Sequence, residues 1–304
     1  MTSFALVGLG KMGANMVRRL SLGGVRPALF DMNPQTTQDL ARETGGFAAT
    51  SLSLLVEHLE APRIVWLMLP AGAATEGAIA QLQSLLSEGD VIVDGANSFY
   101  KDSMRRAATL GRNGMGFVDA GVSGGVHGLA NGYCLMVGGD ANAVDRIKPY
   151  LRLLAPAPDT GWLHAGPAGA GHFVKMVHNG IEYGMMQALA EGFALMGAKK
   201  ELGLDLPAIG ELWRHGSVVR SWLLDLTAEA LKDPAGIEGI APYVPDSGEG
   251  RWTALESIEQ GVPTPVMSLA LMMRFATQGN NDYPARLLAK MRQGFGGHAV
   301  VKND

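Results

Sequence analysis

Two different hydrophobic patterns divide the 304-residue chain. Up to about residue 165, short apolar runs alternate with stretches of helical period, which is typical of a parallel sheet with helices between its strands. The predicted strands lie at 4–10, 26–31, 63–69, 90–96 and 116–121, with further candidates at 132–139 and 160–166. The predicted helices include 11–23, 34–44, 73–87 and 100–113. We therefore expect a doubly wound α/β sheet over residues 1–165.

The pattern changes after about residue 166. Strand-like runs stop, and long helical stretches continue, interrupted by Gly and Pro at 203–207, 232–236 and 260–265. This pattern predicts an all-α C-terminal domain over residues 166–304.

Composition limits the class of protein. Hydrophobic residues make up 47% and charged residues 18%, which is typical of a globular protein. The net charge of -4 indicates no general attraction to nucleic acid or a membrane surface. The N-terminus does not resemble a signal peptide, and the apolar runs are too short to span a bilayer. The single cysteine, Cys134, fits a reducing compartment. We expect a cytoplasmic protein.

A glycine-rich turn, GLGKMG at 8–13, follows the first predicted strand and opens a helix. In such turns the first glycine permits a tight turn, the second lets the backbone approach a pyrophosphate, and the third allows close helix–strand packing. A plain strand-to-helix turn is the alternative, but Asp31 at the end of the second strand favours a dinucleotide-binding, Rossmann-type domain. The candidate cofactor residues of this turn are Gly8, Leu9, Gly10, Lys11, Met12 and Gly13.

Asp31 also bears on the choice of cofactor. Its carboxylate can accept hydrogen bonds from the ribose hydroxyls of NAD, and it would repel the 2'-phosphate of NADP. The following residues offer no adjacent arginine. We therefore expect NAD, with NADP possible. Leu69 and Pro70 lie in LMLPAG (67–72) after another strand and are predicted to line the nicotinamide side, although an ordinary turn would explain them equally well.

The segment KMVHNGIEY (175–183) lies in a long predicted helix. At about 100° per residue, four polar residues fall within about 100° of one another: Lys175, His178, Asn179 and Glu182. A solvated face is the alternative, but such faces rarely hold a compact His–Asn–Gly set. Gly180 costs roughly 1 kcal/mol relative to alanine in a helix. A glycine there is suited to a close approach to the helix backbone.

A lysine and a carboxyl on a cleft wall are suited to acid–base chemistry. Partial desolvation lowers the pKa of a lysine, which can then act as a base near neutral pH, and it raises the pKa of a carboxyl, which can then act as an acid. Beside a nicotinamide, this predicts oxidation of an alcohol, with Lys175 removing the proton. The remaining histidines lie without ligand spacing at 58, 164, 172 and 215, so no metal site is expected.

Four motifs together resemble decarboxylating 6-phosphogluconate dehydrogenases, members of the β-hydroxyacid dehydrogenase superfamily. They are KMVHNGIEYGMMQALAEGF (175–193), DGANSFYKDSMRR (94–106), DAGVSGGVHGLANGYCLMVGG (119–139) and GEGRWTALESIEQGVP (248–263). The resemblance covers nearly the whole chain. One helical half instead of two makes the chain look like the short bacterial form.

The resemblance implies the chemistry and the binding residues. Lys175 would take the proton of the substrate 3-hydroxyl while hydride leaves C3, and Glu182 would protonate C1 after CO2 is lost, giving ribulose 5-phosphate without a metal. Asn97 would act beside them at both cofactor and substrate. The sugar acid would be bound by Asn97, Ser123, Gly124, Gly125, His178 and Asn179, and its phosphate by Tyr183, Arg251, Thr253 and Arg274.

The C-terminal RQGFGGH resembles the family's tail motif. It implies that Arg292 and His298 complete the site of a neighbouring subunit in a homodimer or higher oligomer. A surface charge is the alternative for Arg292. Three features depart from the family: Arg251 replaces a lysine, DMN replaces the Asn-Arg of NADP-using members, and VHG at 126–128 replaces an acidic pair.

Two rival functions stay open. Another β-hydroxyacid dehydrogenase, such as one acting on 3-hydroxyisobutyrate, would share the domain and the helix lysine, but typically has K-x-x-N-N and lacks the acid and the phosphate-binding arginines. A cofactor-binding scaffold without catalysis usually loses the lysine or the acid. Here Lys175, Asn97 and Glu182 are all present.

Overall fold

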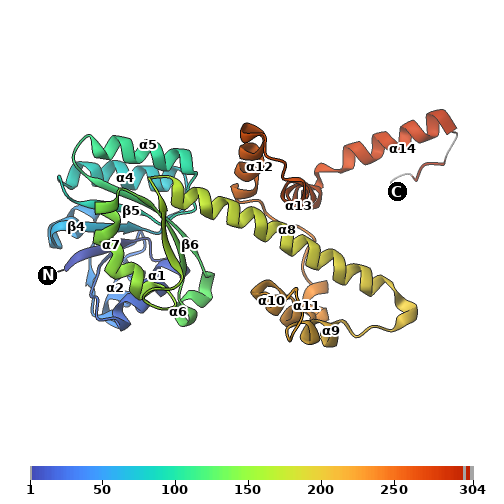
Figure 1. Ribbon diagram of the computed structural model, residues 1–304, viewed down its shortest axis with the longest axis horizontal. Coiled ribbons are helices and arrows are strands. Elements are labelled where there is room, and N and C mark those ends of the chain that lie inside the picture. The colour runs from blue at the N-terminus through green and yellow to red at the C-terminus, as the bar shows by residue number, and fades with distance from the viewer. Residues whose placement is uncertain (1, 297–298, 302–304) are drawn as a thin grey trace. The chain divides into compact units, whose positions relative to one another are not determined.

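The computed structural model describes residues 2–296 and 299–301. The chain divides into two compact units, Met1–Met176 and Val177–Asp304 (Figure 1). The first is an α/β unit and the second is helical, which confirms the predicted fold class. The predicted domain boundary at 165/166 stays a prediction. It coincides with the end of the last strand, whereas the compact units divide later, inside a helix.

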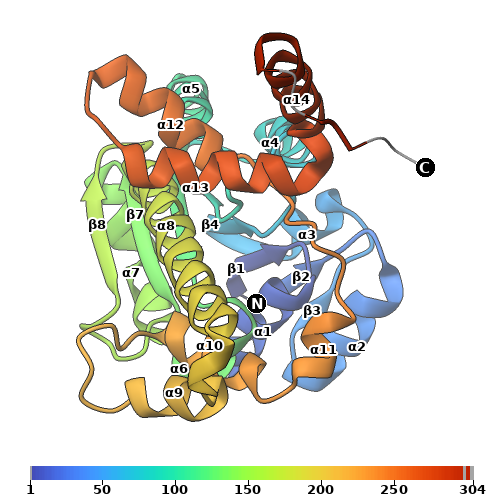
Figure 2. The ribbon, with the colours of Figure 1, turned by 90° about the vertical axis from the view of Figure 1, so that its right-hand side faces the viewer.

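The described residues of the first unit form one eight-stranded sheet in the order β3-β2-β1-β4-β5-β6-β7-β8. Figure 2 shows β1, β2 and β3 side by side. The strands are β1 (Thr2–Val7), β2 (Ala28–Phe30), β3 (Phe47–Ala48), β4 (Leu59–Leu67), β5 (Val91–Asp94), β6 (Gly116–Ser123), β7 (Cys134–Gly139) and β8 (Trp162–Gly166). Every predicted strand is present, and both further candidates extend the sheet.

Two strands depart from the expected parallel direction, because β7 runs opposite to β6 and β8 runs parallel to β7. β7 runs antiparallel to β6, with Ser123 opposite Cys134, whereas the other neighbouring strands pair in parallel. The short η1 (Gly125–His127) and α6 (Gly128–Asn131) connect these two strands, in place of a crossover that would keep them parallel. The two-residue β3 also escaped the hydrophobic pattern because it is too short to show a period.

Helices cover both faces of the sheet. Side chains of α1 (Lys11–Leu22), α2 (Pro34–Thr44) and α7 (Ala141–Leu154) form a core on one face, and those of α3 (Leu52–His58), α4 (Ala73–Leu85) and α5 (Tyr100–Gly111) form a core on the other. In β1, Phe4 and Leu6 enter the first core while Ala5 and Val7 enter the second. This explains the continuous apolar runs, since a strand covered on both faces needs no polar alternation.

The second unit is built from helices alone in its described residues. Helix α8 (Ala170–Ala198) begins in the first unit and continues into the second. It is followed by η2 (Lys200–Leu202), α9 (Leu206–Trp213), α10 (Trp222–Leu231), α11 (Pro234–Glu238), α12 (Glu249–Gln260), α13 (Pro265–Phe275), η3 (Ala276–Asn280) and α14 (Asp282–Gly296). Within the described residues, no helix combines the length and apolar character needed to cross a lipid bilayer.

Candidate active site

The glycine-rich turn joins β1 to α1 at the carboxyl edge of the sheet. Gly8 has φ +91°, a left-handed conformation that favours glycine, and a Cβ there would overlap the carbonyl of Met68. A Cβ on Gly13 would overlap the Gly8 carbonyl. Gly10 caps α1 without a side-chain hydrogen bond, so the first turn presents backbone N–H groups. The turn is therefore shaped to receive a pyrophosphate.

Asp31 follows β2 and is held against this turn. Its Oδ2 accepts a hydrogen bond from the Leu9 amide at 2.7 Å, and its Oδ1 accepts one from the Asn33 amide at 2.9 Å. The Asp31 carboxylate thus lies where it could accept hydrogen bonds from the ribose next to a bound pyrophosphate. Leu69 and exposed Pro70 follow β4, which lies beside β1 in the sheet. Thr75 of α4 fixes their turn by donating a hydrogen bond to the Pro70 carbonyl at 2.9 Å.

Asn97 lies in the loop between β5 and α5. Its two neighbours, Ala96 and Ser98, are buried, whereas Asn97 is exposed. Because β5 is next to β4, this loop opens on the same carboxyl edge as Leu69. The loop therefore presents Asn97 outward from a buried base.

The loop after β6 carries Ser123, Gly124 and Gly125. Gly124 and Gly125 have φ values of +135° and +52°. The buried ring of Tyr133 leaves little room for a side chain here, because a Cβ on Gly124 would lie 3.2 Å from it and one on Gly128 would overlap it. Asn15 of α1 donates a hydrogen bond to the Val126 carbonyl at 3.2 Å. This contact ties the loop to the helix that begins at the glycine-rich turn.

Lys175 is buried, with 7% of its surface exposed, in the part of α8 that belongs to the first unit. A Cβ on Gly121 of β6 would overlap the Lys175 Cβ, so a side chain at 121 would push the helix away. Asp119, also on β6, accepts hydrogen bonds from the Gly169 amide at 2.7 Å and the His172 amide at 2.8 Å. The strand thus caps the helix and sets the position of its lysine.

Cys134 lies near Lys175, and no sequence pattern gave it a place in the site. Burial raises the pKa of its thiol, and the positive charge of Lys175 partly opposes that rise. Cys134 pairs with Ser123 across β6 and β7. The electrostatic effect therefore indicates that the Lys175 ammonium lies close to the strand end that carries Ser123.

The next turns of α8 carry the remaining polar residues of the predicted face. Asn179 is 8% exposed, which rules out a fully solvated face. His178 Nδ1 lies 3.2 Å from Asn179 Oδ1 and 3.9 Å from Glu182 Oε2. The side chains of His178 and Glu182 are each a little over one third exposed. The three residues form one polar cluster on a single helix.

The second unit brings Tyr183 and Arg274 together. The Arg274 guanidinium lies 3.4 Å from the centre of the Tyr183 ring, and its Nη1 donates to the Pro245 carbonyl at 3.1 Å. The Tyr183 hydroxyl lies 3.3 Å from Ser247 Oγ. Arg251 Nε donates to Asp246, in the same segment. The segment 245–247 thus bonds to Arg274, Tyr183 and Arg251. The sequence patterns did not predict that this segment would connect them.

Gly180 of α8 lies against Thr253 of α12, and this contact explains why position 180 has no side chain. A Cβ on Gly180 would lie 2.9 Å from Thr253 Cγ2 and 3.0 Å from Met267 Sδ. Thr253 is buried, and its hydroxyl donates to the Glu249 carbonyl at 2.9 Å. The glycine therefore lets α12 and α13 approach the backbone of α8. The predicted role of Thr253 at the phosphate stays a prediction.

The residues still to be placed are the two of the predicted tail and two of the remaining histidines. Arg292 is exposed on α14, and His298 lies outside the described residues. His172 is buried with its Nδ1 2.7 Å from Ser103 Oγ, and His164 Nε2 lies 2.9 Å from the Gly139 carbonyl. Among residues 2–296 and 299–301, no group of three or more His, Cys, Asp or Glu side chains is placed to hold a metal ion.

Comparisons with known proteins match both units. Residues 3–162 match the family model of the NAD binding domain of 6-phosphogluconate dehydrogenase, and residues 171–286 match that of its C-terminal domain. A Haloferax volcanii 6-phosphogluconate dehydrogenase, named as NAD(+)-dependent and decarboxylating, is 38% identical over 300 residues, and the match covers 98% of each chain.

Longer proteins are also similar. A Bacillus subtilis enzyme of the same name is 35% identical over 285 residues, which cover 90% of this chain and 61% of that protein. The solved 6-phosphogluconate dehydrogenase of Plasmodium falciparum, studied with its cofactor NADP+ and its substrate 6-phosphogluconate, has a TM-score of 0.84 and 29% identity, covering 99% of this chain and 66% of that one. With both units matched by family models and a full-length relative at 38% identity, the chain belongs to the 6-phosphogluconate dehydrogenase family.

Proposed function

We propose that this protein oxidises 6-phosphogluconate and releases CO2, giving ribulose 5-phosphate, with NAD as its preferred cofactor. The observation that carries the proposal is the buried Lys175, docked on Gly121 and continued along α8 by His178, Asn179 and Glu182. The names of the Haloferax and Bacillus relatives support both the reaction and the cofactor.

Lys175 is the general base in this proposal. A bound nicotinamide supplies the hydride acceptor, for which the glycine-rich turn and Asp31 are a fitting cradle. Lys175 removes the proton of the 3-hydroxyl, and the resulting ammonium then stabilises the oxygen that becomes negative as CO2 leaves. Ser123 and the amides of Gly124 and Gly125 hold the carboxylate of the substrate.

Glu182 is the acid of the last step. It lies seven residues after Lys175 on the same helix, about 10 Å along its axis. This spacing lets the two side chains reach different carbons of one extended sugar. The carboxyl of Glu182 donates a proton to C1, while His178 and Asn179 orient the sugar hydroxyls between them. Asn97 approaches the reacting carbon from the β5–α5 loop.

The phosphate binds to the two arginines of the second unit. Arg274 and Tyr183 already lie in contact, and Arg251 can form two parallel hydrogen bonds with phosphate oxygens. Arg251 forms an ion pair with Asp246, and this pair limits the positions that its guanidinium can take. Thr253, on the same helix as Arg251, also binds the phosphate in this proposal.

A combined assay tests this function. Purified protein is mixed with 6-phosphogluconate and either NAD or NADP, and the reduced cofactor and released CO2 are both measured. We expect equal amounts of NADH and CO2, and a higher kcat/KM with NAD. Reduced cofactor without CO2 would favour the 3-hydroxyisobutyrate type of enzyme, and no turnover with either cofactor would contradict the proposal.

Asp31 is the basis of the cofactor preference. Replacing it by serine removes the charge that would repel a 2'-phosphate, and Met32→Arg on the exposed neighbour adds a partner for that phosphate. We expect the double variant to shift the ratio of kcat/KM values toward NADP by about tenfold, since a hydrogen bond to a charged group is worth about 1.5–3 kcal/mol and about 1.4 kcal/mol is a factor of ten. An unchanged ratio would show that the preference arises elsewhere.

A further inference from the structure

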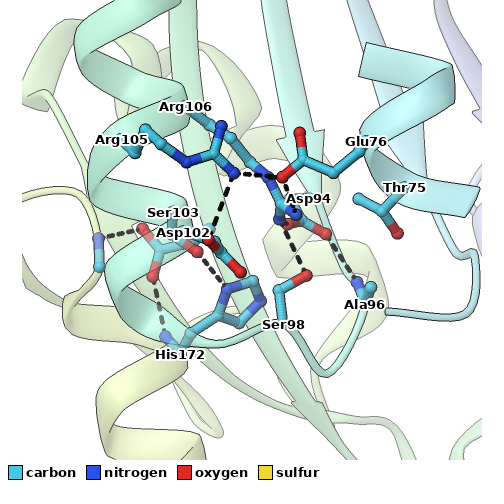
Figure 3. Close-up of polar contacts among 12 residues, drawn as sticks. Thr75, Glu76, Asp94, Ala96, Ser98, Asp102, Ser103, Arg105, Arg106 and His172 are labelled. Atoms are coloured by element: carbon cyan, nitrogen blue, oxygen red, sulfur yellow. Dashed lines mark hydrogen bonds and ion pairs between the residues drawn. The ribbon is translucent and has the colours of Figure 1, made fainter. Parts of the chain in front are cut away.

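Arg106 of α5 is a buried guanidinium, 2% exposed, that joins three separate segments (Figure 3). Its Nη1 donates to Asp94 Oδ2 at 2.6 Å and to Ser98 Oγ at 3.0 Å. Its Nε and Nη2 donate to Glu76 Oε1 of α4 at 3.1 and 2.8 Å. One side chain thus connects the end of β5, the following loop and the start of α4.

The loop that Arg106 grips is the one that presents Asn97. Asp94 uses its second oxygen to accept a hydrogen bond from the Ala96 amide at 3.1 Å, and the Gly95 amide donates to the Leu67 carbonyl at 2.9 Å. On the C-terminal side of Asn97, the Ser98 hydroxyl accepts a hydrogen bond from Arg106. The residues around Asn97 are therefore bonded and buried, and Asn97 faces outward between them.

The charges in this network are costly to bury. Asp94 is 0% exposed, and removing two ions from water offsets most of the attraction between them. Burial would raise the pKa of the Glu76 carboxyl, but hydrogen bonds from Arg105 and Arg106 outweigh it and hold that pKa below its usual range. A second carboxylate therefore also faces the guanidinium. Such a network adds little to the free energy of unfolding, but it fixes the positions of the bonded groups because each hydrogen bond has a defined direction.

We propose that Arg106 is a positioning residue for Asn97, which it holds at the reacting carbon by fixing both ends of the β5–α5 loop. The proposal rests on the proposed function, since it assumes that Asn97 acts on substrate and cofactor. Misplacement of a reacting group by about 1 Å can lower a rate by about 100-fold. We therefore expect Arg106→Met to lower kcat/KM by about 100-fold, mostly through kcat.

A double-mutant cycle tests this directly. Arg106→Met, Asn97→Ala and the double variant are compared in kcat/KM and in the rate of NADH formation in a single turnover. If Arg106 acts through Asn97, its substitution changes the rate by less than about threefold once Asn97 is alanine. A full 100-fold loss in the Asn97→Ala background would overturn the proposal and leave Arg106 as a structural residue only.

Two further variants separate positioning from folding. Arg105→Met is the matched control, because that neighbouring arginine bonds Glu76 and Asp102 and is exposed. It should keep wild-type kcat/KM. If Arg106→Met does not fold, Ser98→Ala removes a single bond of the network and enters the same cycle with Asn97→Ala. A loss that disappears in the Asn97→Ala background supports the proposal, and no loss or an additive loss overturns it.

The proposed function and this inference fail in different ways. A wild-type protein that does not oxidise 6-phosphogluconate contradicts the function itself. A wild-type protein that is active, together with independent effects of Arg106 and Asn97, contradicts only the positioning role.

Discussion

Lys175 is the residue on which the proposed reaction depends most. It is buried against β6, and the rise in the pKa of the Cys134 thiol is partly opposed by its charge. We expect Lys175→Met to lower kcat by about 1,000-fold while leaving the Kd for NAD within a few fold, because a general base contributes about 100- to 10,000-fold. Steady-state kinetics and calorimetric titration with NAD check the two parts.

A lysine outside the site provides the control. Lys199 follows α8 and forms an exposed ion pair with Glu201. Lys199→Met should keep both kcat and NAD binding. A Lys175→Met protein with full turnover would remove the assignment of the base.

Tyr133 carries a buried hydroxyl that finds no hydrogen-bond partner among residues 2–296 and 299–301. A buried polar group without a partner costs about 1–3 kcal/mol, so we expect Tyr133→Phe to raise the free energy of unfolding by about 1 kcal/mol. The ring still supports the Ser123–Gly125 loop in this variant. Urea unfolding at pH 8 measures the change, and a less stable variant would contradict it.

The same residue predicts a pH dependence. Burial raises the pKa of Tyr133 to about 12, above its ordinary value of 10.0. Above pH 10 the unfolded chain loses this proton while the folded chain keeps it, so the wild-type protein loses stability as the pH rises toward 12. Tyr133→Phe has no such loss. The stability difference between the two proteins should therefore be larger at pH 11 than at pH 8.

At the scale of elements, α8 packs against β6 in the first unit and against α12 and α13 in the second. Gly121 and Asp119 of β6 set its beginning, and Gly180 admits α12 and α13 farther along. α12 carries Arg251. If Arg251 binds the phosphate as proposed, the distance between α8 and α12 sets how far that phosphate lies from His178 and Glu182.

Gly180→Ala tests this packing. The new Cβ would gain about 1 kcal/mol of helix propensity but would press on Thr253, whose hydroxyl is already bonded inside α12. Overpacking costs about 1–3 kcal/mol. We expect a net loss of about 1 kcal/mol in stability and a several-fold rise in KM for 6-phosphogluconate.

Gly192 on the same helix is the matched control. A Cβ at this position would meet no atom within 4 Å. Gly192→Ala should therefore stabilise the protein by up to about 1 kcal/mol without changing KM. If both alanines stabilise the protein equally, close approach is not the reason for Gly180.

At the scale of the whole molecule, we propose that the chain acts as an oligomer in which the C-terminal tail completes a neighbouring site. Arg292 is exposed on α14. Arg292→Ala should therefore inactivate the neighbour's site. Mixing it with Lys175→Met, followed by unfolding and refolding together, should restore about a quarter of the wild-type activity if dimers form at random.

The mixing experiment has a clear negative outcome. If Arg292 acted within its own chain, every site of a mixed dimer would still lack one residue and no activity would return. Each variant refolded alone gives the baseline.

Sequence patterns alone predicted most of the elements and the local part of the site. The strands, the helix at 175–182 and the turn at Gly8–Gly13 depend on residues close together in the chain, where hydrophobic period and glycine geometry act directly. The polar face of that helix indicated Lys175, and the family motifs indicated Asn97 and Ser123.

Only the tertiary structure decided which distant residues share an environment. The antiparallel direction of β7, the contact between Gly180 and Thr253, and the grip of Arg106 on Asp94 and Ser98 each join segments that the chain itself keeps apart. No local pattern encodes such contacts, because they arise when apolar faces are buried together and the polar groups carried inward must find partners. Glycine at 180 was visible in the sequence, but its reason lies in another helix.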